Sequence, residues 1–324
     1  MKAIICEQYG LPETLKFGEL PDPVLGPDQV LIQVEACGVN FPDVLIIQNK
    51  YQFRPELPFS PGGEVAGKII ALGENVDKFQ IGDPVLALCG WGGFAEKVAV
   101  DQDRVFLLPK GLKAEEAAST LYTYATAYHA LKDRALLKAG ERLLVLGAAG
   151  GVGLAAVELG KLMDAKVIAA ASSEEKLALC RQKGADLMIN YESEDLKTRI
   201  KELSHGKGVD VIFDPVGGKY TEPALRGIAW QGRYLIVGFA GGDIPKIPMN
   251  LPLLKGCSII GVFWGQFSRL EPKANRENID QLAGWIKEGK IKQHIGKEYR
   301  LEEVPEALQA LLERKMLGKG VVVL

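Results

Sequence analysis

Leu143-Leu-Val-Leu-Gly-Ala-Ala-Gly-Gly-Val-Gly153 joins an apolar run of strand type to a glycine-rich turn, and Leu154-Ala-Ala-Val-Glu-Leu-Gly-Lys161 then continues with helical character. The glycines at 150, 151 and 153 let the backbone approach a ligand that a Cβ atom would repel. The first turn of the new helix points free N–H groups and a positive dipole end at the same place. The stretch therefore predicts a pyrophosphate-binding turn of pattern A-x-G-G-x-G, with Ala148 where the usual dinucleotide fingerprint begins with glycine.

The context of this turn strengthens the prediction. A second strand-like run, Lys166-Val-Ile-Ala-Ala-Ala171, follows at the separation expected of one strand–helix–strand unit. The phosphate-binding loop of nucleoside triphosphatases is excluded, because Gly160-Lys161 is followed by Leu162 rather than by Ser or Thr. A tight turn that binds no ligand is the alternative interpretation.

Composition excludes several classes of function. The 324 residues suit two domains, and 39 basic against 41 acidic residues give a formal net charge of −2. No basic block runs through the chain, so neither nucleic acid nor a membrane surface is an expected partner. The uncharged stretch from Leu143 to Val157 is too short to span a bilayer. The N-terminus lacks the apolar core of a signal peptide.

Cysteine and histidine usage points to a reduced setting without a metal. Five cysteines stand alone at positions 6, 37, 89, 180 and 257, and none forms a C-x-x-C pair. Neither a disulfide framework nor a structural zinc lobe is therefore indicated, and we expect a cytoplasmic protein. Three histidines leave few soft ligands for a transition metal.

The amino-acid composition and the predicted secondary structure of the chain change near residue 120. The first 120 residues are rich in Pro, Gly and β-branched residues, whereas strand–helix alternation begins at Glu141. After about Gly265 the pattern changes again, and we expect this tail to return to the first domain. The predicted fold is α/β, with a β-rich domain over 1–121 and 266–324 and a doubly wound dinucleotide-binding domain over 122–265. The predicted strands of that second domain are 142–146, 166–171, 187–190, 209–213, 232–237 and 258–262.

The end of the second strand of this domain favours NADPH over NADH. A NAD site places a carboxylate there for the ribose hydroxyls, about 20 residues after the turn. This chain has Ser172 and Ser173 instead, which would donate to a 2′-phosphate, and Lys176 supplies a positive charge one helical turn on. Tyr191, at the end of the third strand, is placed to pack by the adenine ribose. A helix cap at Ser172 with a solvated Lys176 is the alternative.

Seven motifs run in one order over nearly the whole chain: Gly38-Val-Asn-Phe-Pro-Asp43, Pro61-Gly-Gly-Glu-Val-Ala-Gly67, Gly82-Asp83, Gly92-Gly-Phe-Ala-Glu96, Thr126-Ala-Tyr128, Ala148-Ala-Gly-Gly-Val-Gly153 and Gly232-Arg-Tyr-Leu-Ile-Val-Gly238. As a set they resemble the medium-chain dehydrogenase/reductase superfamily, in its zinc-free quinone oxidoreductase branch of zeta-crystallin type. The resemblance implies a GroES-like catalytic domain, a Rossmann domain and a cleft between them.

The same resemblance argues against a metal. Zinc-dependent alcohol dehydrogenases of the superfamily place a Cys ligand where this chain has Asn40, and a His where it has Gly63, just before Glu64. Without a Lewis acid to polarise an alkoxide, alcohol oxidation loses its usual driver. Reduction of an electrophilic acceptor remains feasible, so we expect a quinone or an α,β-unsaturated carbonyl as substrate.

Site residues carry over by position in the motifs. Asn40, Tyr51 and Thr126 should line the nicotinamide end of the cleft, with Asn40 and Tyr51 as the catalytic candidates. Leu45 departs from the family, which often has Tyr there, so Tyr51 is the main phenol on that wall. The remaining expected cofactor contacts are Ala149, Gly150, Gly151, Val152, Ser172, Ser173, Lys176, Tyr191, Val237, Gly238, Phe239, Ala240, Val262, Phe263, Trp264 and Arg314. Strand-end packing is the alternative for the aromatic residues among them.

The expected activity is direct hydride transfer from NADPH to a conjugated acceptor, with a proton from Tyr51 or water. An enoyl-thioester or acryloyl-CoA-type reductase is the alternative within enzymes, and Lys50 and Arg54 lie in a loop suited to a CoA phosphate. A largely non-catalytic NADPH-binding protein is a second class. The last strand of the Rossmann sheet, Ser258 to Val262, is a candidate pairing edge, so we expect a homodimer.

Overall fold

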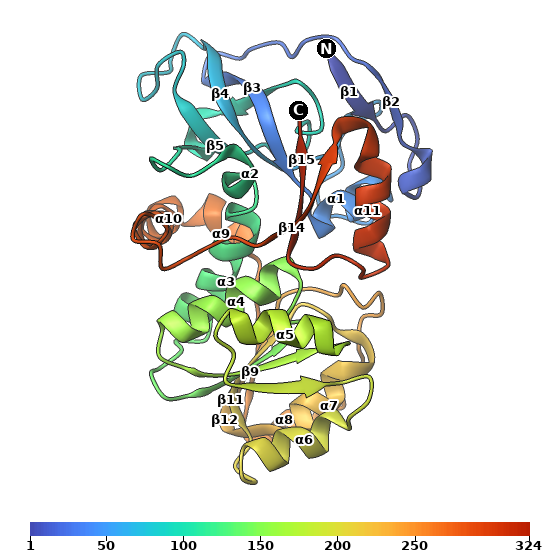
Figure 1. Ribbon diagram of the computed structural model, residues 1–324, viewed down its shortest axis with the longest axis vertical. Helices are drawn as coiled ribbons and strands as arrows, with labels where there is room; N and C mark the ends of the chain where they lie inside the picture. The colour runs from blue at the N-terminus through green and yellow to red at the C-terminus, as the bar shows by residue number, and fades with distance from the viewer. The chain divides into compact units, whose positions relative to one another are not determined.

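The computed structural model describes residues 1–324, which form two compact units (Figure 1). The first unit comprises Met1–Tyr122 and Gln293–Leu324, and the second comprises Thr123–Lys292. The fold class predicted from the sequence is confirmed, because a β-rich unit accompanies an α/β unit with a parallel sheet. None of the helices is both long enough and apolar enough to cross a membrane.

The second unit is built on a six-stranded sheet of order β10-β9-β8-β11-β12-β13. Every neighbouring pair in it is parallel. The order reverses between β8 and β11, the switch point beside which ligands of doubly wound sheets bind. All six predicted strands are confirmed, with ends shifted by a few residues: β8 (Arg142–Leu146), β9 (Lys166–Ala171), β10 (Leu187–Asn190), β11 (Val209–Asp214), β12 (Ile228–Ile236) and β13 (Ser258–Gly261).

Helices cover this sheet on both faces, as buried parallel strands require (Figure 1). Gly160 of α4 lies so close to the sheet that a Cβ atom there would stand 2.7 Å from Leu143 Cδ2. The neighbouring β8 residues Leu144 and Leu146 join a second apolar cluster with Leu196 and Ile200 of α6. The helices that follow the strands are α4 (Gly151–Leu162), α5 (Glu174–Gln182), α6 (Leu196–Leu203), α7 (Thr221–Arg226) and α8 (Asn250–Lys255).

The first unit contains a seven-stranded sheet and a two-stranded one. The larger sheet has the order β14-β15-β3-β4-β5-β7, with β6 paired to β3. Buried residues alternate along β3, where Val30, Ile32 and Val34 enter the core. The strands of this unit are β1 (Lys2–Ile5), β2 (Lys16–Glu19), β3 (Gln29–Gly38), β4 (Glu64–Leu72), β5 (Pro84–Leu88), β6 (Lys97–Asp101), β7 (Val105–Leu107), β14 (Ile295–Arg300) and β15 (Lys319–Val323).

The C-terminal tail completes the first unit. Strand β15 pairs antiparallel with β3, so that Val322 lies opposite Cys37. Helix α11 (Val304–Leu312) buries Val304, Ala307 and Leu308 in the core of this unit, and helix α1 (Phe41–Ile47) buries Ile46 and Ile47 there. The tail therefore joins the N-terminal segment in one unit.

The compact units differ from the predicted domain boundaries in one segment. Residues 266–292 were expected in the first unit, but they lie in the second. Helices α9 (Trp264–Leu270) and α10 (Pro272–Lys287) are held there by specific contacts. The Trp264 indole donates to Asn275 Oδ1 at 2.9 Å, Lys132 Nζ donates to Asn278 Oδ1 at 2.6 Å, and the Tyr128 ring lies 5.2 Å from that of Trp285.

Candidate functional site

The glycine-rich turn of the second unit has the geometry of a backbone cradle. Gly147 follows β8 with φ 57°, and Gly150 donates its N–H to Gly147 O at 3.1 Å. A Cβ atom on Gly153 would stand 2.3 Å from Gly147 O, so only glycine lets α4 start this close to the turn. Ala148 donates its N–H to Ala170 O at 3.1 Å, which ties the turn to β9.

The start of α4 is suited to an anion. Gly150 occupies the N-cap position without any side-chain cap, and no acidic residue lies in the first turn. Gly150, Gly151 and Val152 are only partly buried, whereas Ala149 is buried. The first N–H groups of this 12-residue helix and its dipole therefore have no internal carboxylate to neutralise them.

Four further predicted residues lie at or just beyond the ends of β9 and β10. Lys176 Nζ donates to Ser172 Oγ at 2.9 Å, and Ser173 Oγ caps α5 by accepting the Lys176 N–H at 3.3 Å. Tyr191 donates its N–H to Ala171 O at 3.1 Å, and its ring lies 4.3 Å from that of Tyr220. A hydroxyl and an ammonium are therefore in contact after β9, and Tyr191 is tied by its backbone to the end of the same strand, while the Ser173 hydroxyl caps α5.

The segment after β12 is anchored to the end of β11. Val237 and Gly238 both donate their N–H groups to Asp214 O, and Ala240 donates to Pro215 O at 3.0 Å. The Phe239 ring lies against Gly217, where a Cβ atom would stand 2.9 Å from Phe239 Cδ1. The four residues from Val237 to Ala240 thus follow β12 and are tied to the end of β11, one of the two strands at the switch point.

The remaining predicted residues of the second unit differ in exposure. Val262 donates its N–H to Ile236 O at 2.9 Å, which sets it beside the end of β12. Phe263 is 42% exposed, whereas Trp264 is 4% exposed. The indole N–H of Trp264, the single donor of its side chain, donates to Asn275 Oδ1. Trp264 therefore packs inside the unit, as the strand-end alternative foresaw. Thr126 is half-buried in α3 (Thr126–Tyr128), which packs against α4.

Asp214 organises the turn after β11, and the sequence analysis did not single it out. Its carboxylate, 3% exposed, accepts the N–H groups of Val216 and Gly217 at 2.8 Å each. It also accepts the hydroxyls of Thr221 and Tyr234. Four donors on one carboxylate fix the turn after β11, against which Phe239 rests. A carboxylate directly before Pro215-Val-Gly-Gly218 at a strand end was the available signal.

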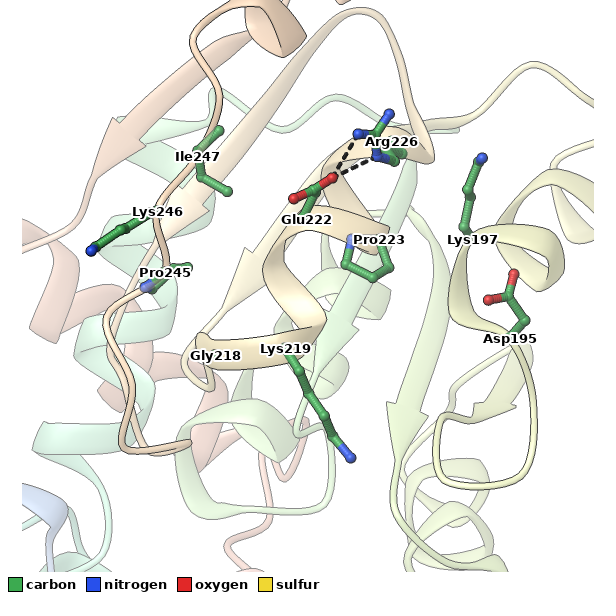
Figure 2. Close-up of a pocket in the computed structure, with 10 residues that line it drawn as sticks. All are labelled: Asp195, Lys197, Gly218, Lys219, Glu222, Pro223, Arg226, Pro245, Lys246 and Ile247. Carbon is green, nitrogen blue, oxygen red and sulfur yellow. Dashed lines mark hydrogen bonds and ion pairs between the residues drawn. The ribbon is translucent and has the colours of Figure 1, made fainter.

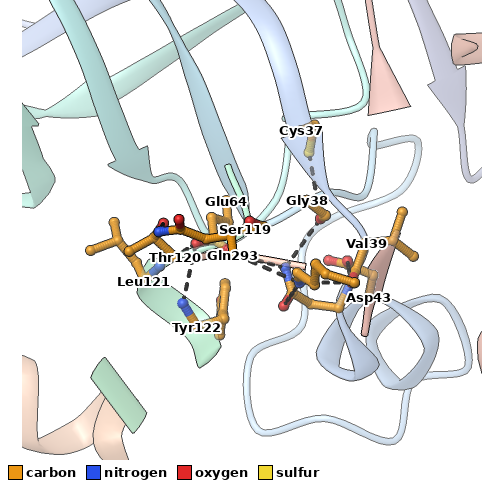
Figure 3. Close-up of polar contacts among 12 residues, drawn as sticks. Cys37, Gly38, Val39, Asp43, Glu64, Ser119, Thr120, Leu121, Tyr122 and Gln293 are labelled. Atoms are coloured by element: carbon orange, nitrogen blue, oxygen red, sulfur yellow. Dashed lines mark hydrogen bonds and ion pairs between the residues drawn. The ribbon is translucent and has the colours of Figure 1, made fainter. Parts of the chain in front are cut away.

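In the first unit, Asn40 is buried and makes polar contacts with Gly38, Glu64 and Lys319. Figure 3 labels Gly38 and Glu64 of this buried polar cluster. Asn40 Nδ2 donates to Gly38 O at 3.1 Å and to Glu64 Oε2 at 3.2 Å, and its Oδ1 accepts from Lys319 Nζ. Glu64 Oε1 in turn accepts the N–H groups of Leu121 and Tyr122, as Figure 3 shows. Every polar atom of the Asn40 amide is therefore used within the unit.

Burial sets the protonation of this cluster. Desolvation raises the pKa of Asp43 to about 7, and it also raises the pKa of Glu64. The positive charge of Lys319 opposes both shifts. Desolvation lowers the pKa of Lys319, and the two carboxylates oppose that shift. The cluster thus pairs one internal cation with two carboxyl groups. Lys319 was missed from the sequence because it opens an apolar strand, Gly320-Val-Val-Val323, where no polar role was expected.

Tyr51 lies in the loop after α1, half-buried against the core of the first unit. Its ring centroid is 5.8 Å from that of Phe53. Burial raises the pKa of its phenol, and the charge of Asp43 raises it further, so the phenol keeps its proton at neutral pH. Arg314 also belongs to the first unit, where it follows α11 with φ 56°.

A pocket of about 420 Å³ lies elsewhere on the second unit (Figure 2). Four basic side chains (Lys197, Lys219, Arg226 and Lys246) and two acidic ones (Asp195 and Glu222) line it. Arg226 pairs with Glu222 at 2.6 Å, and Figure 2 marks this contact. Lys219 pairs with Glu192 at 3.5 Å outside the lining. The lining therefore carries more basic than acidic side chains.

Comparison with known proteins decides the family. The family model described as "Alcohol dehydrogenase GroES-like domain" matches residues 26–110, and the one described as "Zinc-binding dehydrogenase" matches residues 151–283. The quinone oxidoreductase-like protein 2 homolog of Nematostella vectensis is 40% identical over 99% of this chain and 88% of its own length. The chain belongs to the quinone oxidoreductase branch of the medium-chain dehydrogenase/reductase superfamily. The sequence-based resemblance is confirmed, and the chain is an oxidoreductase of this superfamily.

Solved structures of this superfamily agree with the fold over the whole chain. Escherichia coli quinone oxidoreductase complexed with NADPH has a TM-score of 0.95 at 26% identity and covers all of both chains. The CurK enoyl reductase has a TM-score of 0.90 at 26% identity and covers 99% of this chain and 98% of its own.

The zinc named in one family description does not fit the residues present. Positions 40 and 63 hold Asn and Gly, and the direction in which a side chain at 63 would point is filled, because Tyr122 Oη lies 2.9 Å from the site of a Cβ atom. The Asn40 side-chain oxygen already accepts a hydrogen bond from the Lys319 ammonium. No group of three or more His, Cys, Asp or Glu side chains is arranged to hold a metal ion.

Proposed function

We propose that this protein is a zinc-independent, NADPH-dependent reductase of quinones or α,β-unsaturated carbonyls that works in the cytoplasm. The observation that carries the proposal is the contact of Lys176 with Ser172 at the end of β9, next to the uncapped glycine-rich start of α4. A ribose-binding carboxylate is replaced there by a donor and a cation, which suits a 2′-phosphate. The NADPH bound to the E. coli relative supports the same cofactor.

The residues of the first unit support an acceptor that needs no metal. Positions 40 and 63 hold Asn and Gly, so neither a thiolate nor an imidazole is offered to a Lewis acid, and the Asn40 and Glu64 side chains contact the Lys319 ammonium instead. An acceptor whose carbonyl is conjugated forms a stabilised enolate or hydroquinone anion, and it needs orientation more than acid catalysis.

Each residue has a distinct part in the proposed reaction. NADPH, when bound, supplies the hydride, which adds to the electron-poor carbon of the acceptor. The start of α4 and Lys176 hold the phosphates, and the segment from Val237 to Ala240 supports the nicotinamide half. Tyr51 donates a hydrogen bond to the acceptor oxygen, and the proton comes from Tyr51 or from water. Because the Asn40 amide is committed internally, we assign it a supporting part rather than the substrate contact.

Titration in one cuvette tests the proposal. NADPH and NADH are added in turn while nicotinamide fluorescence is followed, and phenanthrenequinone and a simple enone are then added. We expect tighter binding of NADPH and its consumption once an acceptor is present. A preference for NADH would contradict the assignment of Ser172 and Lys176. Binding without consumption by any acceptor would favour the non-catalytic role.

Tyr51→Phe is expected to lower kcat with a quinone by about tenfold, because it removes one hydrogen-bond donor from the acceptor oxygen. NADPH affinity should stay within about twofold, since the predicted phosphate contacts lie on α4 and α5. Steady-state kinetics and fluorescence titration measure the two effects. An unchanged kcat would remove Tyr51 from the mechanism.

An enoyl-thioester reductase is the second candidate, and the fold shared with the CurK enoyl reductase supports it. Lys50 and Arg54 are exposed in the loop around Tyr51, where a CoA phosphate would find positive charge. Acryloyl-CoA as the acceptor tests it directly. A kcat/KM above that for the free enone, lost on Lys50→Ala with Arg54→Ala, would establish the thioester as the better substrate.

We also propose that two copies pair along β13. No strand lies beyond β13 in the sheet, and Leu253 and Leu254 of the preceding helix are 77% and 70% exposed. Sedimentation should give twice the mass of one chain. Ile259→Lys on β13 should give monomers, whereas Leu187→Lys on the opposite edge strand β10, equally exposed at 37%, should leave the dimer intact. A monomeric parent protein would refute the pairing.

A further inference from the structure

Lys319 is a lysine inside the first unit whose ammonium has a full set of partners. The residue is 5% exposed, and Nζ donates to Val39 O at 2.8 Å and to Asn40 Oδ1. Glu64 Oε2, on a residue without exposed surface, lies 3.8 Å from Nζ. An unpaired buried charge is costly, so the ammonium and the carboxylate each depend on the other.

The Asn40 amide lies between these two charges. An ammonium only donates hydrogen bonds and a carboxylate only accepts them. The amide must therefore turn Oδ1 toward Lys319 and Nδ2 toward Glu64, and its second N–H meets Gly38 O at 3.1 Å. No other orientation of Asn40 satisfies both neighbours, which means that the two charges fix the rotamer.

The fixed position of Asn40 also fixes the start of α1. Asn40 is the N-cap of that helix, and its own N–H donates to Asp43 Oδ2 at 2.7 Å in a capping box. The helix ends at Ile47, and Lys50 donates its N–H back to Leu45 O at 2.8 Å. Tyr51 is the next residue. A short helical segment, hydrogen-bonded at both ends, thus connects the fixed amide with the residue that carries the phenol of the proposed site.

We propose that Lys319 is a positioning residue of the reductase: from the C-terminal strand it orients Asn40, and through α1 it sets the place of Tyr51. Its role rests on the function proposed for Tyr51. The Lys319 ammonium contacts Asn40, the position at which zinc-dependent members of the superfamily are expected to place a Cys ligand, and it acts there as an organising charge without taking part in the chemistry.

Three variants separate positioning from simple charge balance. Lys319→Met leaves Glu64 unpaired, and we expect the melting temperature to fall by about 10 °C. Adding Glu64→Gln removes the second charge and should restore most of that loss. The double variant should nevertheless keep kcat with phenanthrenequinone roughly tenfold or more below the parent, because Asn40 is no longer oriented from both sides. Lys319→Arg keeps the charge and should retain kcat to within about threefold.

Two measurements make the result independent of turnover. NADPH affinity should be unchanged in every variant that folds. Hydrogen exchange of residues 41–51, followed by mass spectrometry, should be faster in the double variant than in the parent and near the parental rate in Lys319→Arg. If the parent reduces no acceptor, the proposed function fails, and the exchange result still decides the role of Lys319.

A double variant with parental stability, parental kcat and parental exchange over 41–51 would overturn the proposal, since Lys319 would then only balance the charge of Glu64. Slow turnover together with fast exchange in a stable double variant would support it.

Discussion

Gly153→Ala should destabilise the second unit and abolish measurable NADPH binding. The new Cβ atom would stand 2.3 Å from Gly147 O and 2.9 Å from Ala148 Cα, both of which are backbone atoms of the same turn. Neither can move without shifting β8 or the start of α4. Overpacking of this kind costs about 1–3 kcal/mol, and the displaced turn loses its cradle shape. Urea unfolding and nicotinamide fluorescence measure the two losses.

Gly150→Ala is the matched control in the same turn. A Cβ atom there would have only Gly147 O near it, at an ordinary 3.5 Å, and the backbone lies at φ −80°, which any residue adopts. We expect the free energy of unfolding to stay within about 1 kcal/mol of the parent, while NADPH affinity falls because the methyl group would face the phosphates. If Gly150→Ala bound NADPH as well as the parent, the turn would not be the pyrophosphate site.

Asp214→Ala should produce the second large effect. Four buried donors, the N–H groups of Val216 and Gly217 and the hydroxyls of Thr221 and Tyr234, would lose their common acceptor. A buried donor left without a partner costs about 1–3 kcal/mol, so the free energy of unfolding should fall by roughly 3 kcal/mol or more. NADPH affinity should fall as well, since Phe239 rests on the released turn. Urea unfolding with and without NADPH measures both.

Two milder substitutions in the same hydrogen-bond network should each cost less stability than Asp214→Ala. Asp214→Asn keeps one oxygen for the two backbone N–H groups, and the hydroxyls can turn to accept from the new amide, so its cost should be smaller than that of alanine. Tyr234→Phe removes a single hydroxyl and should cost about 1 kcal/mol. Equal stability of Asp214→Ala and Tyr234→Phe would mean that the carboxylate does not organise the turn.

Local sequence patterns sufficed for the Rossmann sheet. Apolar runs punctuated by glycine gave all six strands, and the return of the tail to the first unit follows from its last strand. Ser172 and Lys176 were predictable because they are neighbours on one helical turn, and they do touch. Whether the predicted set binds NADPH stays a prediction for the titration above.

The features that could not be predicted from the sequence depend on contacts between residues outside any local sequence pattern. Lys319 meets Asn40 279 positions earlier in the chain, so no local pattern marks it. Residues 266–292 were expected in the other unit because their helices look like any amphipathic pair until Asn275 and Asn278 meet their partners. Trp264 looked like a cofactor contact until its indole was found to bond inside the unit.

The place of β15 has a consequence for how the protein is made. Residues 123–292 form one contiguous unit, whereas the first unit needs residues 293–324 to supply β14, β15 and Lys319. On the ribosome, domains fold as their residues emerge. The second unit is therefore synthesised in full before the first unit can close, and Glu64 gains its counter-ion only after Lys319 has been translated.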